Sequence, residues 1–473
     1  MKKAGKEAIK QMIKTLITNI RRILLPDDMI LLLKLAIPII GSSLLHMTYN
    51  LTDLIWVGRL GSGATASVGT AGFFMNLGWA MASIITMGVG VKIAHAVGAR
   101  DDNEAGRFAA SGMHGIGALA LGYSLILLFG APFLIQFFNL EDQQVIADAV
   151  TYLRINSFSM IFMLFGLLFI NIINAHGYTK LSFKVSLTGT LLNIVLDPLL
   201  IHTFQLGVPG AAYATLTARM VTLLVAIFVI QRQNKIHFAD KKLSYPHLRK
   251  ILKIGVPTSM QRVAFVLIYI LLARIIAEWG AVAIAVQKVG VQIESLTFMF
   301  TGGLTQAMAI AVGQQYGANN LTRIKGIYTE GQKLALGIGA ASTLLFLSVP
   351  EFLFSIFLTE PESIRMGANY LRILAVSQIF MCLEMITAGA FNGMGRTDIP
   401  AKVSILFTSL RIPAAYLLGF YTLLGLNGVW WSISGTSLFK GVILYILFRK
   451  IFGKMLNTQN QPTNESIQVN EPN

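Results

Sequence analysis

Charged residues are scarce in this sequence. They make up 13% of its 473 residues, against about 25% in an ordinary soluble domain. Cysteine is almost absent too, because Cys382 is the only one and it lies in an apolar run. A single cysteine excludes both a disulfide framework and a cluster of thiolate metal ligands. With 54% hydrophobic residues, the composition describes a polytopic membrane protein.

Acidic side chains are the rarer charge. The chain has 22 Asp and Glu against 38 Lys and Arg, which gives a net charge of +16. The basic residues are spread over short loops and form no basic face interleaved with aromatics, so no nucleic-acid partner is expected. Residues 1–28 are predicted to form a basic amphipathic segment on the cytoplasmic leaflet. Residues 453–473 are polar and are predicted to form a disordered tail.

Apolar stretches long enough to cross a bilayer recur along the whole chain. About 20 residues at a rise of 1.5 Å span a hydrocarbon core of about 30 Å. We count twelve such stretches, at residues 30–58, 67–97, 106–135, 150–176, 181–204, 208–231, 249–278, 284–315, 326–350, 365–392, 399–423 and 426–450. We therefore expect an all-α fold with twelve transmembrane helices.

The loops between these stretches alternate in charge. One side carries basic loops such as 98–107, 231–250 and 317–325, whereas the other carries the acidic "NLEDQ" at 139–143 and "TEPES" at 359–363. Because basic loops stay inside, both termini and the central loop are predicted to be cytoplasmic. The expected location is the cytoplasmic membrane of a bacterium or archaeon.

The sequence also repeats itself. Three words recur in order, at offsets of 219, 219 and 218: "LKLAIP" (33–38) as "LKIGVP" (252–257), "AHAVGAR" (94–100) as "GQQYGAN" (313–319), and "GYTKLSFKVS" (177–186) as "GRTDIPAKVS" (395–404). Such an offset predicts two six-helix lobes related by pseudo-two-fold symmetry, an N-lobe at 29–232 and a C-lobe at 249–452, with a cytoplasmic loop at 233–248. Internal repeats of this kind are common in transporters that alternate access.

These words, together with "LTDLIWVGRLG" at 51–61, resemble the multidrug and toxic compound extrusion (MATE) family of transporters. The resemblance covers nearly all of residues 30–450. It implies two six-helix bundles around a central cavity, and export of organic, often cationic compounds in exchange for H+ or Na+. The word "LLNIVLDPLLI" in the fifth span is most like the DinF-like branch.

The acid in the first span draws attention without any resemblance. A charged side chain near the middle of a bilayer costs about 2.5–3.5 kcal/mol, so Asp53 needs a partner or a function. Asp197 lies at comparable depth, one helical turn after Asn193. The DinF-like resemblance implies that Asp53, Asn193, Asp197 and Thr215 form an ion- or proton-coupling site. Two adjacent carboxylates at low dielectric favour retention of one proton, and Asp53 with Asp197 would hold Na+ if sodium is the coupling ion.

Other polar residues inside the spans are candidates for two further roles. Four are candidates for lining the substrate cavity: His46, Tyr152, Asn171 and Asn174. Asn174 stands where many relatives carry Arg, and Phe265 stands about where the NorM-like branch carries an acid. Four others are expected to form a C-lobe polar network, either by structural pairing or by handling ions and substrate: Arg262, Glu294, Glu384 and Arg411. Arg219 could neutralise an N-lobe carboxylate, which would weaken the cation-site hypothesis.

The sequence thus predicts a secondary antiporter for multidrug efflux. It is not expected to be an enzyme, because no metal constellation or activated nucleophile is present, and no cofactor beyond the coupling ion is expected. Its expected partners are small organic molecules and the lipid bilayer, and it is expected to be a monomer. The alternative is a flippase for a lipid-linked oligosaccharide, which needs a strongly cationic cavity. Four intramembrane arginines keep that alternative open: Arg219, Arg262, Arg274 and Arg411.

Overall fold

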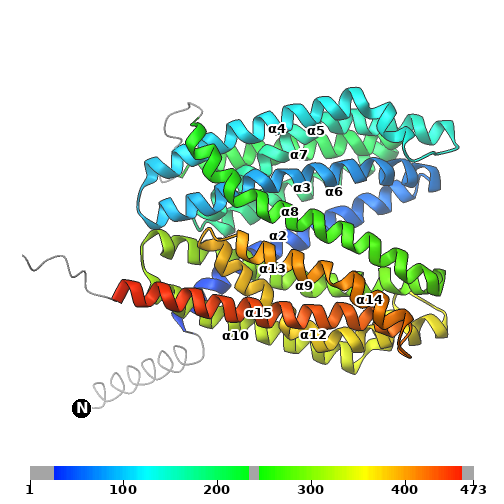
Figure 1. Ribbon diagram of the computed structural model, residues 1–473. Helices are drawn as coiled ribbons and strands as arrows, with labels where there is room; N and C mark the ends of the chain where they lie inside the picture. Colours follow the sequence, from blue (N-terminus) through cyan, green and yellow to red (C-terminus); the bar gives the residue numbers. More distant parts are fainter. Residues whose placement is uncertain (1–25, 234–243, 461–473) are drawn as a thin grey trace, which may run out of the picture.

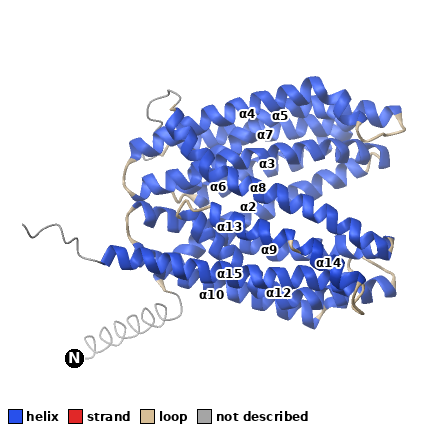
Figure 2. Cartoon of the chain, in the orientation of Figure 1, coloured by secondary structure: helices blue, strands red, loops and turns tan. Residues whose placement is uncertain are grey.

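The computed structural model describes residues 26–233 and 244–460, and within them every regular element is helical (Figure 2). The N-terminal half contains α2 (Asp27–Gly58), α3 (Ser62–Gly98), α4 (Asp102–Gln136), α5 (Gln143–Ala175), α6 (Thr179–Pro198), the π-helical turn η1 (Leu199–Thr203) and α7 (Gly207–Gln231). The C-terminal half contains α8 (Tyr245–Ile276), the 3-10 turn η2 (Ala277–Trp279), α9 (Ala281–Gly317), α10 (Leu321–Ser348), α11 (Pro350–Ser355), α12 (Pro361–Gly393), α13 (Asp398–Ser409), α14 (Arg411–Phe420) and α15 (Leu426–Asn460).

The twelve predicted spans correspond to these helices one by one. Eleven helical segments in the described part of the chain are long and apolar enough to cross a membrane, when α6 with η1, α8 with η2, and α13 with α14 each count as one. The twelfth is α10, which has 28 residues and a polar first half that contains Lys333 ion-paired to Glu330. The all-α, polytopic prediction is therefore confirmed.

The backbone itself shows the duplication. Three pairs of glycines with positive φ are related by the same offsets as the repeated words, and each pair occupies equivalent turns of the two halves: Gly61 and Gly280, Gly177 and Gly395, and Gly207 and Gly425. Arg100 and Asn319 form a fourth pair, with φ of 60° and 54°. The residues that follow Arg100 and Asn319 cap the next helices, α4 and α10. Asp101 accepts a hydrogen bond from the Glu104 amide, and Asn320 accepts one from the Arg323 amide.

Figure 1 shows the two halves as two bundles that lie side by side. We call "linker face" the end of the molecule where α2 and α8 begin and α7 and α15 end, and "far face" the opposite end. The first helix of each half crosses to the other bundle near the linker face. Leu32 and Leu35 of α2 belong to the core of the C-terminal bundle, and Ile251 of α8 belongs to the core of the N-terminal bundle.

Hydrogen bonds between the bundles lie in the linker-face half of the helices and at their midpoints. Near the midpoint Ser83 of α3 meets Ser259 of α8, with 3.1 Å between the hydroxyl oxygens, and Arg262 lies over the Trp79 ring. Within the described ranges, the other hydrogen bonds between the two halves lie closer to the linker face. The structure therefore holds the lobes together at the linker face.

The chain ends bear on three predicted segments. Almost all of the predicted amphipathic segment 1–28 and most of the predicted loop 233–248 lie outside the described residues. Helix α15 continues to Asn460, so the predicted tail begins later than residue 453. The remainder of that tail, 461–473, also lies outside the described residues.

Candidate functional site

The predicted coupling residues come together in the N-lobe, in the half of the helices nearer the far face. Asp53 lies five residues before the end of α2, and Asp197 lies one residue before the end of α6. Asn193 and Asp197 are fully buried and Thr215 of α7 is nearly so, whereas Asp53 is half-buried. Asp53 is close enough for its charge to act on Asp197. The structure thus assembles all four residues around one location.

Helix α6 presents two of these groups on one face. The Asn193 Nδ2 donates to Asp197 Oδ1 at 3.1 Å, as residues four apart in a helix can do. Directly after Asp197 the helix contains Pro198 and then widens into the π-helical turn η1. Proline lacks the amide that would continue the helical ladder, and π-turns often occur at functional sites. The local backbone therefore changes at the residue that carries the buried carboxylate.

Helix α2 contributes Tyr49 as well as Asp53 to this cluster, and Tyr49 is not among the residues expected from the sequence. Tyr49 lies one turn before Asp53, and its hydroxyl oxygen is 3.0 Å from Thr215 Oγ1. The Tyr49 ring stacks on His46 with 6.1 Å between ring centroids, which places His46 beside this cluster on an exposed part of the helix. The spacing of four residues between Tyr49 and Asp53 places both on one face of the helix and could have identified Tyr49 from the sequence.

Helix α5 adds Tyr152, which is buried and electrostatically coupled to both carboxylates. It also adds Ser159, whose Oγ accepts from Arg219 Nη1 at 3.1 Å. The Arg219 charge acts on Asp53, but among the described residues it makes no ion pair within 4.0 Å of any carboxylate. Arg219 therefore moderates the negative charge of the cluster without occupying its centre.

Three buried oxygens of this cluster have no hydrogen-bond partner in the described part of the protein: Asp53 Oδ1, Asn193 Oδ1 and Asp197 Oδ2. An unpaired buried polar group costs about 1–3 kcal/mol, and native structures contain few of them. This cluster contains three such oxygens, from two carboxylates and one amide. Oxygens of these kinds are the ligands that a hard cation prefers. The donors present thus fit Na+, and a proton on either carboxylate would fit as well.

Asn171 and Asn174 are not brought to this cluster. They lie near the linker-face end of α5, whereas Tyr152 lies toward its far-face end, and the separation along the helix is about 28 Å or more. Asn171 Nδ2 donates to Leu167 of its own helix. Asn174 accepts from Ser182 Oγ at 2.5 Å and joins α5 to α6. Neither asparagine therefore lies beside the carboxylates, and a place for them in the substrate cavity stays a prediction.

The C-lobe residues form two buried hydrogen-bonded units, one around Glu294 and one around Glu384. Glu294 of α9 accepts from Tyr370 and Gln378 of α12, each at 3.0 Å. Glu384 pairs with Lys440 of α15, with 2.9 Å between Nζ and Oε2. Lys440 is not among the residues expected from the sequence.

Arg411 lies between these two units. It donates to Thr436 at 2.9 Å and to Ser437 at 2.8 Å, and it is within electrostatic range of both Glu294 and Glu384. Arg262 is exposed on α8 and faces Trp79 of the other lobe, so it does not belong to the predicted network. The C-lobe network therefore has two acids and two bases, with Lys440 in place of Arg262.

The four intramembrane arginines do not converge. Arg219 binds Ser159, Arg262 faces Trp79, and Arg411 binds α15. Arg274 is exposed and pairs with Glu278. A single cationic cavity for a pyrophosphate headgroup, which the flippase alternative requires, is therefore not assembled from them. In the described ranges no group of three or more His, Cys, Asp or Glu could hold a metal ion.

With this geometry established, comparison with known proteins gives the family. A family model described as MatE matches residues 38–199 and 257–417, one segment in each lobe. The chain belongs to the MatE family. It is therefore a membrane transporter and not an enzyme, as predicted, and transporters of this family are ion-coupled antiporters.

Individual relatives agree with this assignment. The probable multidrug resistance protein NorM of Thermotoga maritima is 27% identical over 431 residues, which cover 88% of this chain and 91% of that protein. The uncharacterized transporter YisQ of Bacillus subtilis is 24% identical, covering 89% of this chain and 94% of that protein.

Solved structures agree as well. A crystal structure of a MATE protein in the bent conformation superposes with a TM-score of 0.85 at 25% identity, covering 92% of this chain and 98% of that one. An outward-facing multidrug resistance MATE transporter gives a TM-score of 0.82 at 25% identity, covering 92% and 98%. The predicted fold of this family is confirmed.

Proposed function

We propose that this transporter exports organic, often cationic compounds from the cytoplasm in exchange for H+ or Na+ that binds at Asp53, Asn193, Asp197 and Thr215. The observation that carries the proposal is the group of three buried oxygens without partners in this cluster. Relatives named as multidrug resistance proteins support the substrate class. The described residues of the N-lobe thus supply buried oxygen atoms that could bind a cation.

The coupling follows from electrostatics. Two carboxylates that share a buried site repel one another, so a conformation that keeps both charged and close is unfavourable. A cation or proton at the site removes that repulsion and allows α2, α6 and α7 to pack more closely. Loss of the cation reverses this change. The ion gradient would thereby bias which arrangement of these helices is populated.

The Tyr49–Thr215 hydrogen bond and the Asn193–Asp197 hydrogen bond hold the helices in register around the site. Arg219 supplies a nearby positive charge that would weaken cation binding and so help release. Tyr152 closes the cluster from α5 as a buried neutral side chain. Tyr49, Arg219 and Tyr152 would thus tune ion affinity without being ligands themselves.

Three finer predictions belong to the same proposal. The linker face, which carries most of the basic loops, is placed in the cytoplasm of a bacterium or archaeon by the positive-inside rule. The acids of the first and fifth spans, together with Phe265, favour the DinF-like branch. A monomer is expected, because each lobe has its own hydrophobic core and the site lies within one lobe.

The decisive measurement is export of a fluorescent organic cation from proteoliposomes under an imposed H+ gradient or Na+ gradient. We expect one of the two gradients to drive export in the native protein. The double variant Asp53→Asn/Asp197→Asn should export at least about tenfold more slowly under the gradient. A loss of about 1.4 kcal/mol of coupling free energy, which equals one pKa unit, is enough for a tenfold effect.

Asp148→Asn is the matched control, since Asp148 is an N-lobe carboxylate near the far-face end of α5 that accepts a bond from Gln144 outside the cluster. This variant should export at the native rate. Equal gradient-dependent export by the native protein and the Asp53→Asn/Asp197→Asn variant would refute the coupling site. Export by neither gradient would refute the antiport mechanism.

A further inference from the structure

The linker face contains two hydrogen bonds that are related by the internal repeat. His95 of α3 and Gln314 of α9 occupy equivalent positions in the repeated words "AHAVGAR" and "GQQYGAN". The His95 Nε2 donates to the carbonyl of Gly393 at 2.6 Å, and the Gln314 Nε2 donates to the carbonyl of Ala175 at 2.9 Å. Each bond joins the two lobes, and its acceptor is the last residue of a helix, α12 or α5.

The two acceptors are themselves a repeat pair, because Ala175 and Gly393 each lie two residues before the glycine with positive φ that follows the helix, Gly177 or Gly395. Carbonyls in the last turn of a helix have no partner within that helix, and they carry the negative end of the helix dipole. Here each is satisfied by the opposite lobe. Separation of the lobes at the linker face would return both carbonyls and both donors to water.

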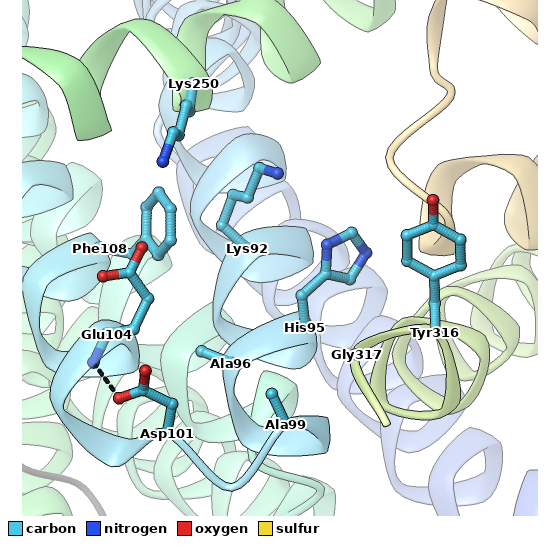
Figure 3. Close-up of a pocket in the computed structure, with 10 residues that line it drawn as sticks. All are labelled: Lys92, His95, Ala96, Ala99, Asp101, Glu104, Phe108, Lys250, Tyr316 and Gly317. Atoms are coloured by element: carbon cyan, nitrogen blue, oxygen red, sulfur yellow. Dashed lines mark hydrogen bonds between the residues drawn. The ribbon is translucent and has the colours of Figure 1, made fainter. Parts of the chain in front are cut away.

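Two glycines allow this close approach. Gly98 and Gly317 end α3 and α9 and are also equivalent in the repeated words. A Cβ on Gly98 would lie 1.8 Å from the Gln314 carbonyl oxygen, and a Cβ on Gly317 would lie 1.8 Å from the His95 carbonyl oxygen. Figure 3 shows His95 of α3 facing Tyr316 and Gly317 of α9. The backbones of α3 and α9 are therefore in direct contact.

We propose that His95, Gln314, Gly98 and Gly317 form a two-fold-symmetric latch, which holds the lobes closed at the linker face and must open whenever the transport cycle separates them there. The latch rests on the transporter activity of the family and not on the proposed cation site. Because its halves come from equivalent positions of the two lobes, it opens or closes as a unit.

The proposal predicts a shift in the conformational equilibrium. One neutral hydrogen bond of this kind contributes about a twofold to tenfold factor to an equilibrium constant. His95→Ala/Gln314→Ala should therefore increase the ratio of linker-face-open to closed molecules by about fivefold to a hundredfold. Gly98→Ala/Gly317→Ala should shift it in the same direction, because each added methyl group overlaps a carbonyl oxygen of the other lobe only in the closed state.

Double electron–electron resonance can measure that ratio without substrate or ion gradient. Cys382 is the only cysteine, so Cys382→Ala provides a background without thiols. Spin labels at Asn103→Cys and Thr322→Cys lie on exposed, repeat-related positions at the starts of α4 and α10, one in each lobe. With the unmodified latch, the distance between the two spin labels should be mainly short. Both double variants should add a second population with a longer distance. The latch variants and their controls all keep the residues of the proposed cation site, so a difference between them does not depend on that site.

Matched controls exist for both double variants. His176 bonds to its own helix at Ile172, and Gln459 bonds to Asn319 within the C-lobe, so His176→Ala/Gln459→Ala removes the same side chains near the same face without touching the latch. Gly90 and Gly302 lie on α3 and α9, where a Cβ would meet nothing closer than 3.8 Å, so Gly90→Ala/Gly302→Ala adds the same methyl groups harmlessly. Both control pairs should keep the short distance.

Distance distributions of the latch variants equal to those of their controls would overturn the proposal. The single variant Gln314→Ala guards against misfolding of a double variant. It should remain monodisperse and show about half of the logarithmic shift. No shift in that folded single variant would also count against the latch.

Discussion

The buried pair of Lys440 and Glu384 gives a stability prediction with a definite order. Their side chains are each only 9% exposed, and Nζ lies 2.9 Å from Oε2. At an effective dielectric constant of about 20, the attraction at this distance is about 6 kcal/mol. The cost of removing both charges from water offsets most of it. Removal of one partner leaves the other charge buried and alone, which costs about 3–5 kcal/mol.

The position of Arg411 makes the two single variants unequal. In Lys440→Met, Glu384 keeps the nearby positive charge of Arg411, so we expect a loss of about 3 kcal/mol. In Glu384→Gln, Lys440 and Arg411 are left as like charges within range of each other, so we expect a loss of about 5 kcal/mol. The double variant Lys440→Met/Glu384→Gln should return to within about 1–2 kcal/mol of the native protein, since an ion pair can often be replaced as a whole at little cost.

These losses of unfolding free energy can be measured in a double-mutant cycle, in which each variant is unfolded in detergent by titration with denaturant. Ion-driven export in liposomes distinguishes structural pairing from a direct role. A structural pair predicts that the double variant is both stable and active. A loss below about 1 kcal/mol for either single variant, or a larger loss for Lys440→Met than for Glu384→Gln, would refute the reasoning. A stable double variant without export would show that the pair handles ions or substrate.

Two further changes test the N-lobe assignment. Arg219→Gln removes a positive charge that acts on Asp53, so the cation concentration for half-maximal export should fall about threefold to tenfold, an effect of about 1 kcal/mol at this kind of separation. Arg232→Gln, at the linker-face end of the same helix where Arg232 lies over Phe228, should leave that concentration unchanged. Asn174→Ala leaves the Ser182 hydroxyl without its side-chain acceptor and should lower the free energy of unfolding by about 1–2 kcal/mol. Its export at saturating gradient should remain native, and a changed ion dependence would contradict the placement of Asn174 away from the site.

The arrangement of spans could be predicted from the sequence because bilayer thickness fixes the length of an apolar helix. The repeat could be predicted because its words include turn residues whose backbone geometry both halves need, as the positive φ at Arg100 and Asn319 shows. The crossing of α2 and α8 into opposite cores could not be predicted. Burial of Leu32 by one lobe or the other leaves the same apolar pattern in the sequence.

For the site, pairs within one helix were predictable and pairs between helices were not. Asn193 and Asp197 follow from a spacing of four residues. Glu384 and Lys440 lie on different helices, α12 and α15, and no local pattern joins them. Asn171 was grouped with Tyr152 because a position within a span was not converted into depth, although the stretch of helix from Tyr152 amounts to about 28 Å. Tyr49 could have been found by applying the same spacing rule backwards from Asp53.

The repeat also supplies an internal control for the function of the N-lobe cluster. The offsets of the repeated words map its residues onto the C-lobe, where the equivalents of Tyr49, Asp53, Asp197 and Thr215 are, in that order, Ile268, Leu272, Ala415 and Ile433. All four equivalents belong to a single apolar cluster. The equivalent of Asn193 is Arg411, which bonds to Thr436 and Ser437. The positions of the two carboxylates can thus be filled with hydrocarbon, which avoids the cost of about 1–3 kcal/mol for each unpaired buried oxygen. Since packing alone does not require an acid at either position, the presence of both carboxylates in the N-lobe supports the proposed ion coupling over a purely architectural role.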